Sequence, residues 1–373
     1  MKLGIIGNGT LGKATGILGR NTKEIKILCY DIKSELCKPM GTTMDEILTC
    51  NMIFICLPTP MGFNGKCQIE SIVETVKNIR QQQYKGDIII RSTVPPATSR
   101  SLGCYHLPNF STRDSYESDF KTLNHHIVGI NENLPNNIEF KTTIQQLFTQ
   151  SKSNNAISSD TLEFVSADES EIIKYTRNAF LATKVSFFNE INSYCKRLGV
   201  SYETVRKNVC VDNRIGDSHS IVPGPDGKPG FGGKSLMKDL VSFCMSMESA
   251  NVPPLLLRPI VGRNVRKDRP NEVWHDPVAE VYTKQQLTNF NTTRLKEIAT
   301  NKKIQYKDPI EKNELIELIL NNKDNNDNNN NDNNNKDNNK SRYAHHPSNF
   351  PKTNNNLENK PSIGFNSGIQ NPF

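Results

Sequence analysis

The chain has 373 residues, a formal net charge of +7 and nine scattered cysteines without a C-x-x-C spacing. This length allows two or three domains, the mild positive charge favours anionic small molecules without indicating nucleic acid by itself, and the cysteine pattern argues against a disulfide framework or a zinc site. Because no apolar run approaches the ~20 residues that cross a bilayer, and because the chain opens on a predicted strand rather than a signal peptide, we expect a soluble cytoplasmic protein without a metal.

The first 150 residues alternate between predicted strands and predicted helices. Short apolar segments predict buried strands at 1–7, 25–31, 52–60, 87–96 and 125–130. After the first of them, Thr10 to Arg20 predicts a helix with one apolar face. Strands that alternate with helices indicate an α/β fold, a doubly wound parallel sheet of the Rossmann type over residues 1–150.

From Ser166 the pattern changes to helix, and residues 160–265 predict an all-helical central domain. Apolar residues follow a period near 3.6 from Ala167 to Leu198. So long a helix usually needs a partner, and we expect it to be a dimerisation element. Ser201 is the expected N-cap of a further helix.

The last part of the chain divides into three segments. Residues 266–283 are interpreted as a linker, and residues 284–320 as a small unit of two short amphipathic helices around an extended connector. This unit resembles SAP-like and Rho-N-terminal-like modules and would be a tether for nucleic acid or protein; an adventitious helical hairpin is the alternative. The Asn-rich segment 321–373 has too few apolar residues to offset the entropy of ordering, so we expect disorder there.

A glycine pattern near the start of the chain points to a dinucleotide. "GNGTLG" places Gly7, Gly9 and Gly12 between a strand and a helix, where backbone amides bind a pyrophosphate and glycines permit its close approach. Asp31 ends the second strand, where a carboxylate bonds the ribose hydroxyls and repels a 2′-phosphate. The pattern predicts NAD rather than NADP, and a glycine turn that serves only packing is the alternative.

Other polar residues lie where a doubly wound sheet binds its ligands. Thr59 and Thr93 follow strands at their carboxyl ends and could each contact cofactor or substrate, although a strand-end cap explains either one. Lys174 and Asn178 stand four apart on the long helix and share a face. For Lys174 the alternative is an ordinary solvated surface lysine.

The stretch "GFGGKSLMKD" at 230–239 combines glycines with three polar residues, Ser235, Lys238 and Asp239. Glycines let the backbone approach a ligand closely or take up positive φ. A serine hydroxyl needs an adjacent base to act as a nucleophile, and the motif supplies no histidine.

Together these motifs resemble the UDP-glucose/GDP-mannose dehydrogenase family, most of all its UDP-glucose 6-dehydrogenases and the short forms carried by phages and large DNA viruses. The matching pieces come in family order over residues 1 to about 265: "GNGTLG", "FICLPTP", "STVPP", "KYTRNAFLATKVSFFNEI", "DNRIG" and "GFGGKSLMKD". The resemblance implies a NAD-dependent, two-step oxidation of a nucleotide-sugar C6 alcohol to a carboxylate. It also implies a homodimer in which Arg214, in "DNRIG", reaches the substrate of the neighbouring subunit.

The resemblance implies roles for individual residues as well. The cofactor residues would be Gly7, Gly9, Gly12 and Asp31, together with Thr59. Thr93 would sit in the active site, and Lys174 and Asn178 would bind the developing oxyanion and an ordered water. Asp239 would complete that network, and Lys238 would lie near the substrate.

The chain departs from the family pattern in three places. Ser235 stands where the family has its nucleophilic cysteine, Asn109 and Arg113 replace two glutamates of the family's Pro-Glu-Phe-Leu-x-Glu-Gly pattern, and no strand–helix alternation follows residue 265, where the family continues into a UDP-gripping domain. The first two changes affect the second oxidation, so we expect an oxidoreductase limited to the first step. The alternatives are a pseudoenzyme that binds NAD or a partner without turnover, and a DNA- or virion-associated protein that uses residues 284–320.

Overall fold

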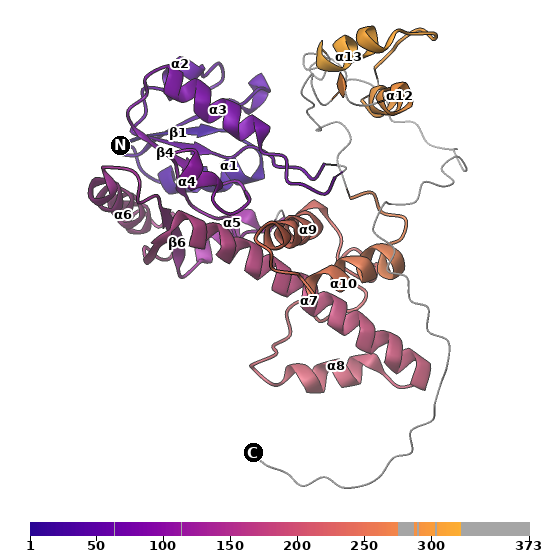
Figure 1. Cartoon of the computed structure of the whole chain (residues 1–373). Coiled ribbons are helices and arrows are strands. Elements are labelled where there is room, and N and C mark those ends of the chain that lie inside the picture. Colours follow the sequence, from indigo (N-terminus) through magenta and orange to yellow (C-terminus); the bar gives the residue numbers. More distant parts are fainter. Residues whose placement is uncertain (63, 113, 275–286, 289–290, 303, 322–373) are drawn as a thin grey trace. The chain divides into compact units, whose positions relative to one another are not determined.

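The computed structural model describes residues 1–62, 64–112, 114–274, 287–288, 291–302 and 304–321 (Figure 1). Arg113, residues 275–283 of the expected linker and all but the first residue of the Asn-rich segment lie outside these ranges. No helix in the described ranges is long and apolar enough to cross a membrane.

A seven-stranded sheet forms the N-terminal part of the chain, with strand order β2-β1-β3-β4-β5-β6-β7. The strands are β1 (Lys2–Ile6), β2 (Lys26–Tyr30), β3 (Met52–Ile55), β4 (Asp87–Ile90), β5 (Tyr105–His106), β6 (His126–Ile130) and β7 (Leu162–Ser166). All neighbours run parallel except β5 and β6. The doubly wound α/β prediction is confirmed, with one antiparallel pair that the sequence did not indicate.

Helices cover both faces of the sheet, and strand alternation explains why. In β3, Met52 and Phe54 pack into one apolar cluster with α1, α5 and α6, whereas Ile53 and Ile55 pack into another with α2 and α3. A strand buried on both faces reads as a continuous apolar run. These helices are α1 (Thr10–Thr15), α2 (Met44–Ile47), α3 (Glu70–Gln81), α5 (Tyr116–Thr122) and α6 (Asn137–Ser153).

The long helix α7 (Ala167–Leu198) has the predicted bounds because both of its ends are specified locally. At the start, Ser166 and Glu169 form a capping box: Glu169 N donates to Ser166 Oγ at 3.2 Å, and Ser166 N donates to Glu169 Oε2 at 2.7 Å. At the end, Gly199 adopts a φ of +70°, the left-handed conformation that terminates helices.

The faces of α7 differ from what its apolar period suggested. Several of its polar side chains are buried, and they are Ser170, Glu171, Lys174, Asn178, Ser186, Asn189 and Asn192. Large apolar residues are instead exposed, with Phe180 at 64%, Phe187 at 55% and Tyr194 at 62%. The inward side of the helix therefore carries many polar groups beside its buried apolar residues, and an apolar stripe lies outward.

Further helices pack on or follow α7. They are α8 (Tyr202–Cys210), α9 (Lys234–Ser249) and α10 (Leu257–Arg263), while the short α4 (Thr98–Ser101) contacts α7 from the sheet side. Leu240 and Cys244 of α9 pack with Ala179 and Ala182 of α7 in one apolar cluster.

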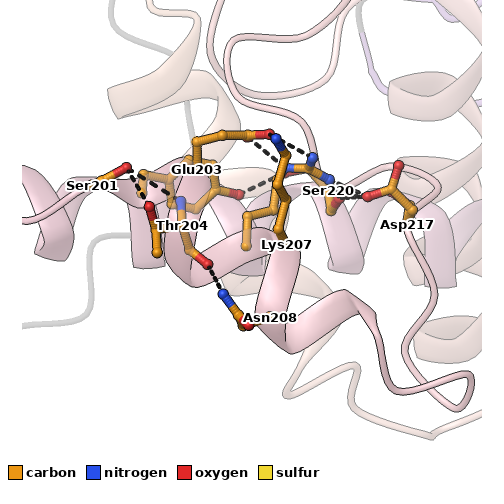
Figure 2. A network of polar contacts seen from close by, with 9 residues as sticks. Ser201, Glu203, Thr204, Lys207, Asn208, Asp217 and Ser220 are labelled. Atoms are coloured by element: carbon orange, nitrogen blue, oxygen red, sulfur yellow. Dashed lines mark hydrogen bonds and ion pairs between the residues drawn. The ribbon is translucent and has the colours of Figure 1, made fainter.

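Helix α8 begins at its predicted N-cap, because Thr204 N donates to Ser201 Oγ at 3.2 Å. Figure 2 shows the polar network that follows. Arg206 donates to Glu203 Oε2 at 2.8 Å, to Ser220 Oγ at 3.0 Å and to Asp217. These bonds tie the loop after α8 back onto the helix.

Residues 291–302 and 304–321 contain α12 (Thr292–Asn301) and α13 (Lys312–Asn321). Both helices were predicted, and they share an apolar cluster that includes Leu295, Ile298, Leu315 and Ile319. The tether role of this unit stays a prediction.

Candidate functional site

The glycine loop after β1 has the geometry of a ligand cradle. Gly7 adopts a φ of +90°, and a Cβ on Gly12 would lie 2.1 Å from Gly7 O, so both positions require glycine. A Cβ on Gly9 would meet nothing within 4 Å, which leaves open space above the loop. The loop lies between the ends of β1 and β3, where the strand order reverses and doubly wound sheets bind ligands.

Asp31 is tied directly to this loop. Its Oδ2 accepts a hydrogen bond from Asn8 N at 2.7 Å, and its Oδ1 accepts one from Lys33 N at 3.0 Å. The carboxylate is therefore held by the backbone at the end of β2, beside the glycines. These residues fit a dinucleotide: an open cradle for the pyrophosphate and a fixed acceptor for ribose hydroxyls.

The remaining polar residues predicted for the site lie in one continuous chain of contacts. Thr59 Oγ1 donates to Thr93 O at 2.8 Å, and Lys238 Nζ lies 3.5 Å from Thr59 Oγ1. Lys238 Nζ also pairs with Asp239 Oδ1 at 2.6 Å. The fold thus joins the ends of β3 and β4 to the first turns of α9.

The contact chain continues onto α7. Asn178 Nδ2 donates to Asp239 Oδ2 at 2.5 Å, and Lys174 Nζ lies 3.4 Å from Asn178 Oδ1. Lys174 and Lys238 are each 9% exposed and Asp239 is 1% exposed. The surface alternative for Lys174 is therefore wrong: its side chain is buried in a polar cluster.

The two lysines of this cluster have different electrostatic environments. Burial is the main cause that lowers the pKa of Lys174, opposed by the charge of Asp239. Burial is the largest single influence on the pKa of Lys238 and would lower it, but Asp239 and Cys67, through their charges and hydrogen bonds, together outweigh burial and raise that pKa. Lys238 is thus held as an ammonium, whereas Lys174 is the amine whose proton is more easily removed.

The loop after β5 approaches this cluster through Phe110. Its ring centroid lies 5.7 Å from Lys174 Nζ and 3.9 Å from Arg177 Cζ. The side-chain amide of Asn109 is engaged within its own loop, because its Oδ1 accepts hydrogen bonds from Ser111 N at 3.3 Å and Ser111 Oγ at 2.9 Å.

Ser235 lies in the first turn of α9 and is exposed. Because Lys238 and Asp239 follow it by three and four residues, it shares their face of the helix. In the part of the chain that the structure describes, no side chain hydrogen-bonds to its hydroxyl. No histidine, lysine or carboxylate activates this serine there.

Arg269 and Asn264, which sequence reasoning missed, hold the loop that leads to Ser235. Arg269 donates to Pro229 O at 2.8 Å and to Asp226 Oδ2 at 2.6 Å. Phe231 N donates to Asn264 Oδ1 at 3.0 Å, and Asn264 Nδ2 donates to Phe231 O at 3.0 Å. A Cβ on Gly232 would lie 2.4 Å from Arg269 Nη1, so the glycine makes room for this clamp.

Cys67 is a second residue that sequence reasoning missed. Its Sγ lies 3.8 Å from Lys238 Nζ and 3.6 Å from Thr93 O, inside the same buried cluster. Burial raises the pKa of this thiol, which opposes thiolate formation. A loop cysteine without a motif gives no signal in the sequence.

Arg214 follows α8 and pairs with the nearby Asp212, whose Oδ1 accepts from Arg214 Nε at 3.0 Å. Its side chain is 89% exposed. Among the described residues it makes no contact with the Lys174–Asp239 cluster. Its predicted role toward a neighbouring subunit stays a prediction.

Comparison with known proteins agrees with this geometry. Residues 37–107 match the NAD binding domain of the UDP-glucose/GDP-mannose dehydrogenase family, and residues 168–266 match its central domain. These two segments belong to this family. The match to the NAD binding domain supports NAD as the cofactor, as the glycine loop and Asp31 predicted.

Curated relatives share the family but are longer. A UDP-glucose 6-dehydrogenase of Rickettsia felis is 26% identical over 73% of this chain and 66% of its own length. One of Pseudomonas aeruginosa is 29% identical over 60% of this chain and 50% of its own length. The chain therefore spans about half to two thirds of these proteins.

Solved structures share the fold. A UDP-glucose dehydrogenase from Pyrobaculum islandicum matches with a TM-score of 0.60 and 21% identity, over 71% of this chain and 68% of that one. A 3-hydroxyisobutyrate dehydrogenase from Mycobacterium tuberculosis matches with a TM-score of 0.52 and 14% identity, over 72% of this chain and 94% of that one. At these identities the likeness concerns the fold.

Proposed function

We propose that the protein is a NAD-dependent oxidoreductase that oxidises the primary alcohol of a nucleotide sugar of the UDP-glucose type. The observation that carries this proposal is the buried contact chain from Thr93 through Lys238 and Asp239 to Lys174, beside the Gly7–Gly12 loop. Buried charged groups that converge beside a cofactor cradle are typical of active sites.

The cofactor would lie against residues of the sheet edge. Gly7, Gly9 and Gly12 leave room for the pyrophosphate, and Asp31 would accept hydrogen bonds from ribose hydroxyls. When bound, NAD supplies the acceptor for the hydride of the alcohol carbon. Asp31 would also repel the 2′-phosphate of NADP.

Lys174, Asn178 and Asp239 would handle the proton and the developing charge. As the alcohol loses its proton, negative charge grows on its oxygen, and the ammonium of Lys238 and the amide of Asn178 can stabilise it. Lys174, with its lowered pKa, can hold the released proton or pass it to water. Asp239 fixes Asn178 by its 2.5 Å hydrogen bond.

Ser235 would limit the reaction to the first oxidation. A second oxidation needs a covalent adduct or a hydrate of the aldehyde, and Ser235 offers a hydroxyl without an activating base. We therefore infer one NADH and one aldehyde for each sugar oxidised, with little uronic acid.

The same proposal includes a homodimer through α7. Ile172, Phe180, Phe187 and Tyr194 are exposed, and their spacing of eight, seven and seven residues keeps them on one side of the helix. A second copy of this chain, with the same stripe, would bury these side chains on both subunits. Sedimentation as a monomer at micromolar concentration would contradict this part.

The decisive experiment follows NADH formation with UDP-glucose and a panel of other nucleotide sugars, with hydroxylamine to trap aldehyde and mass spectrometry of the product. We expect a burst of one NADH per sugar. Lys174→Met should abolish this burst. Lys196→Met, which changes an exposed lysine on the same helix, should keep it. Ser235→Ala should leave the burst unchanged, and Ser235→Cys should at most open a slow second step.

Two outcomes would change the conclusion. Two NADH per sugar at a steady rate in the unaltered protein would mean that serine performs the role of the family's cysteine. NAD binding without NADH from any nucleotide sugar would favour a pseudoenzyme.

A further inference from the structure

A half-open cavity of about 490 Å³ lies on the sheet domain, bounded by the loop after β5, by α5 and by the start of β6. Arg91, His126 and Arg177 are among its lining residues. None of the roles proposed for the dehydrogenase site uses these three side chains. Their charges and unmet hydrogen bonds indicate what the cavity binds.

Arg91 is a buried cation without a carboxylate partner among the described residues. It is 1% exposed, its Nη1 donates to Thr15 Oγ1 at 2.9 Å, and its Nε donates to Leu107 O at 3.3 Å. Its Cζ lies 5.0 Å from the centroid of Phe120. These contacts fix the guanidinium but leave its charge uncompensated, which is costly in the interior.

His126 provides a second, independent observation. It is 2% exposed, and its Nε2 has no hydrogen-bond partner. Burial, followed by the charge of Arg91, lowers its pKa to about 4. Buried polar atoms in folded proteins are nearly always paired, so this orphaned nitrogen, on a residue that lines the cavity, points to a missing partner.

The remaining charged groups leave the cavity with an excess of positive charge. Arg177 reaches it from α7, lying 3.9 Å over the ring of Phe110. Asp119 is the carboxylate among the lining residues, and its Oδ2 already accepts from Thr112 N at 2.8 Å and Thr112 Oγ1 at 2.9 Å. His125, also on the wall, is exposed.

We propose that this cavity binds an oxyanion, a phosphate or carboxylate group of a small molecule, with Arg91 and Arg177 supplying the charge and His126 Nε2 a further hydrogen bond. Guanidinium groups match the planar, multiple acceptor geometry of such groups. The cavity volume leaves room for the molecule that carries the oxyanion. This inference does not depend on the dehydrogenase activity.

The test is a titration of the full chain with inorganic phosphate, followed by NMR of isotope-labelled histidine. The His126 resonance is assigned by its loss in His126→Gln. We expect a saturable shift of this resonance and a rise in the pKa of His126, because an anion offsets the charge of Arg91. A parallel titration with malonate distinguishes carboxylate from phosphate recognition, and chloride controls for charge screening.

Variants then locate the site. Arg177→Gln should weaken phosphate binding by about tenfold, the effect expected for loss of a charged hydrogen bond. Arg197→Gln, at an exposed position on the same helix, should bind as the unaltered protein does. Arg91→Met should abolish the His126 shift, and Arg177→Gln still decides the question if Arg91→Met does not fold.

Three results would overturn the proposal. The first is no saturable His126 shift with either phosphate or malonate. The second is equal affinity in Arg177→Gln and the unaltered protein. The third is an equal shift with chloride, which would mean screening of Arg91 rather than binding.

Discussion

Glu171 on α7 offers a sharp test of the buried polar face. It is fully buried, its Oε1 accepts from Ser99 N at 2.8 Å, and its Oε2 has no hydrogen-bond partner. Burial is the main cause that raises its pKa from 4.5 to about 7. The substitution Glu171→Gln keeps an oxygen for Ser99 N and removes the titrating proton.

The magnitude follows from the difference between the folded and unfolded pKa of Glu171. Below its unfolded value of 4.5 both states hold the proton; above it the unfolded chain ionises first, so stability falls as the pH rises to about 7 and then levels off. A difference of about 2.5 between the folded and unfolded pKa of Glu171 corresponds to a loss of about 3 kcal/mol in the free energy of unfolding. The free energy of unfolding of Glu171→Gln, relative to that of the unaltered protein, should therefore rise by about 3 kcal/mol from acid to neutral pH.

Urea unfolding followed by circular dichroism from about pH 4 to about pH 8 measures this difference. Glu163→Gln, at an exposed position on β7, is the matched control and should follow the pH dependence of the unaltered protein. Parallel pH profiles for Glu171→Gln and the unaltered protein would refute the reasoning.

Three further predictions concern the cofactor loop and the cysteines. Gly12→Ala should weaken NAD binding at least tenfold by calorimetry, because the new Cβ would lie 2.1 Å from Gly7 O, whereas Gly16→Ala, whose Cβ would meet only Ile5 Cδ1 at 3.9 Å, should bind normally. Asp31→Ala should narrow the preference for NAD over NADP, and equal affinities in the unaltered protein would contradict its assigned role. Iodoacetamide should modify Cys210 first, since it alone of the nine cysteines is not buried, and mass mapping of a faster site elsewhere would count against the fold.

Much of the fold was predictable because the signals are local. The bounds of α7 follow from the capping box at Ser166 and the glycine at 199, and β3 reads as a buried strand because both of its faces are covered. The two-residue β5 was not predicted, since Tyr105–His106 is too short to show a period. Its antiparallel pairing with β6 depends on tertiary packing.

The site was predictable in part, for a geometric reason. Thr59 and Thr93 follow the neighbouring parallel strands β3 and β4, whose ends meet at one edge of the sheet. Periodicity also gives which residues share a face of α7, as for Lys174 and Asn178. It does not give which face is buried, because burial depends on what α9 and the sheet bring to that face.

Residues that depend on the path of distant segments were beyond sequence reasoning. Cys67 reaches the cluster through a loop, and Arg269 reaches the Gly-rich loop from about forty residues along the chain. Arg91, which follows β4, and His126, the first residue of β6, meet at one cavity. No local pattern encodes these contacts.

The energetics of the buried cluster favour a site that still binds its ligand over a site that has lost its function. Lys174, Lys238 and Asp239 place two ammonium groups against one carboxylate, and all three are at least nine-tenths buried. Buried ion pairs are often no more stabilising than apolar side chains of similar volume, and an unbalanced charge adds a cost. A chain that had lost its ligand would gain stability by replacing these groups. Oxidation of an alcohol would create an oxyanion beside Asn178, and its negative charge would balance the excess positive charge. This first oxidation needs no thiol at position 235.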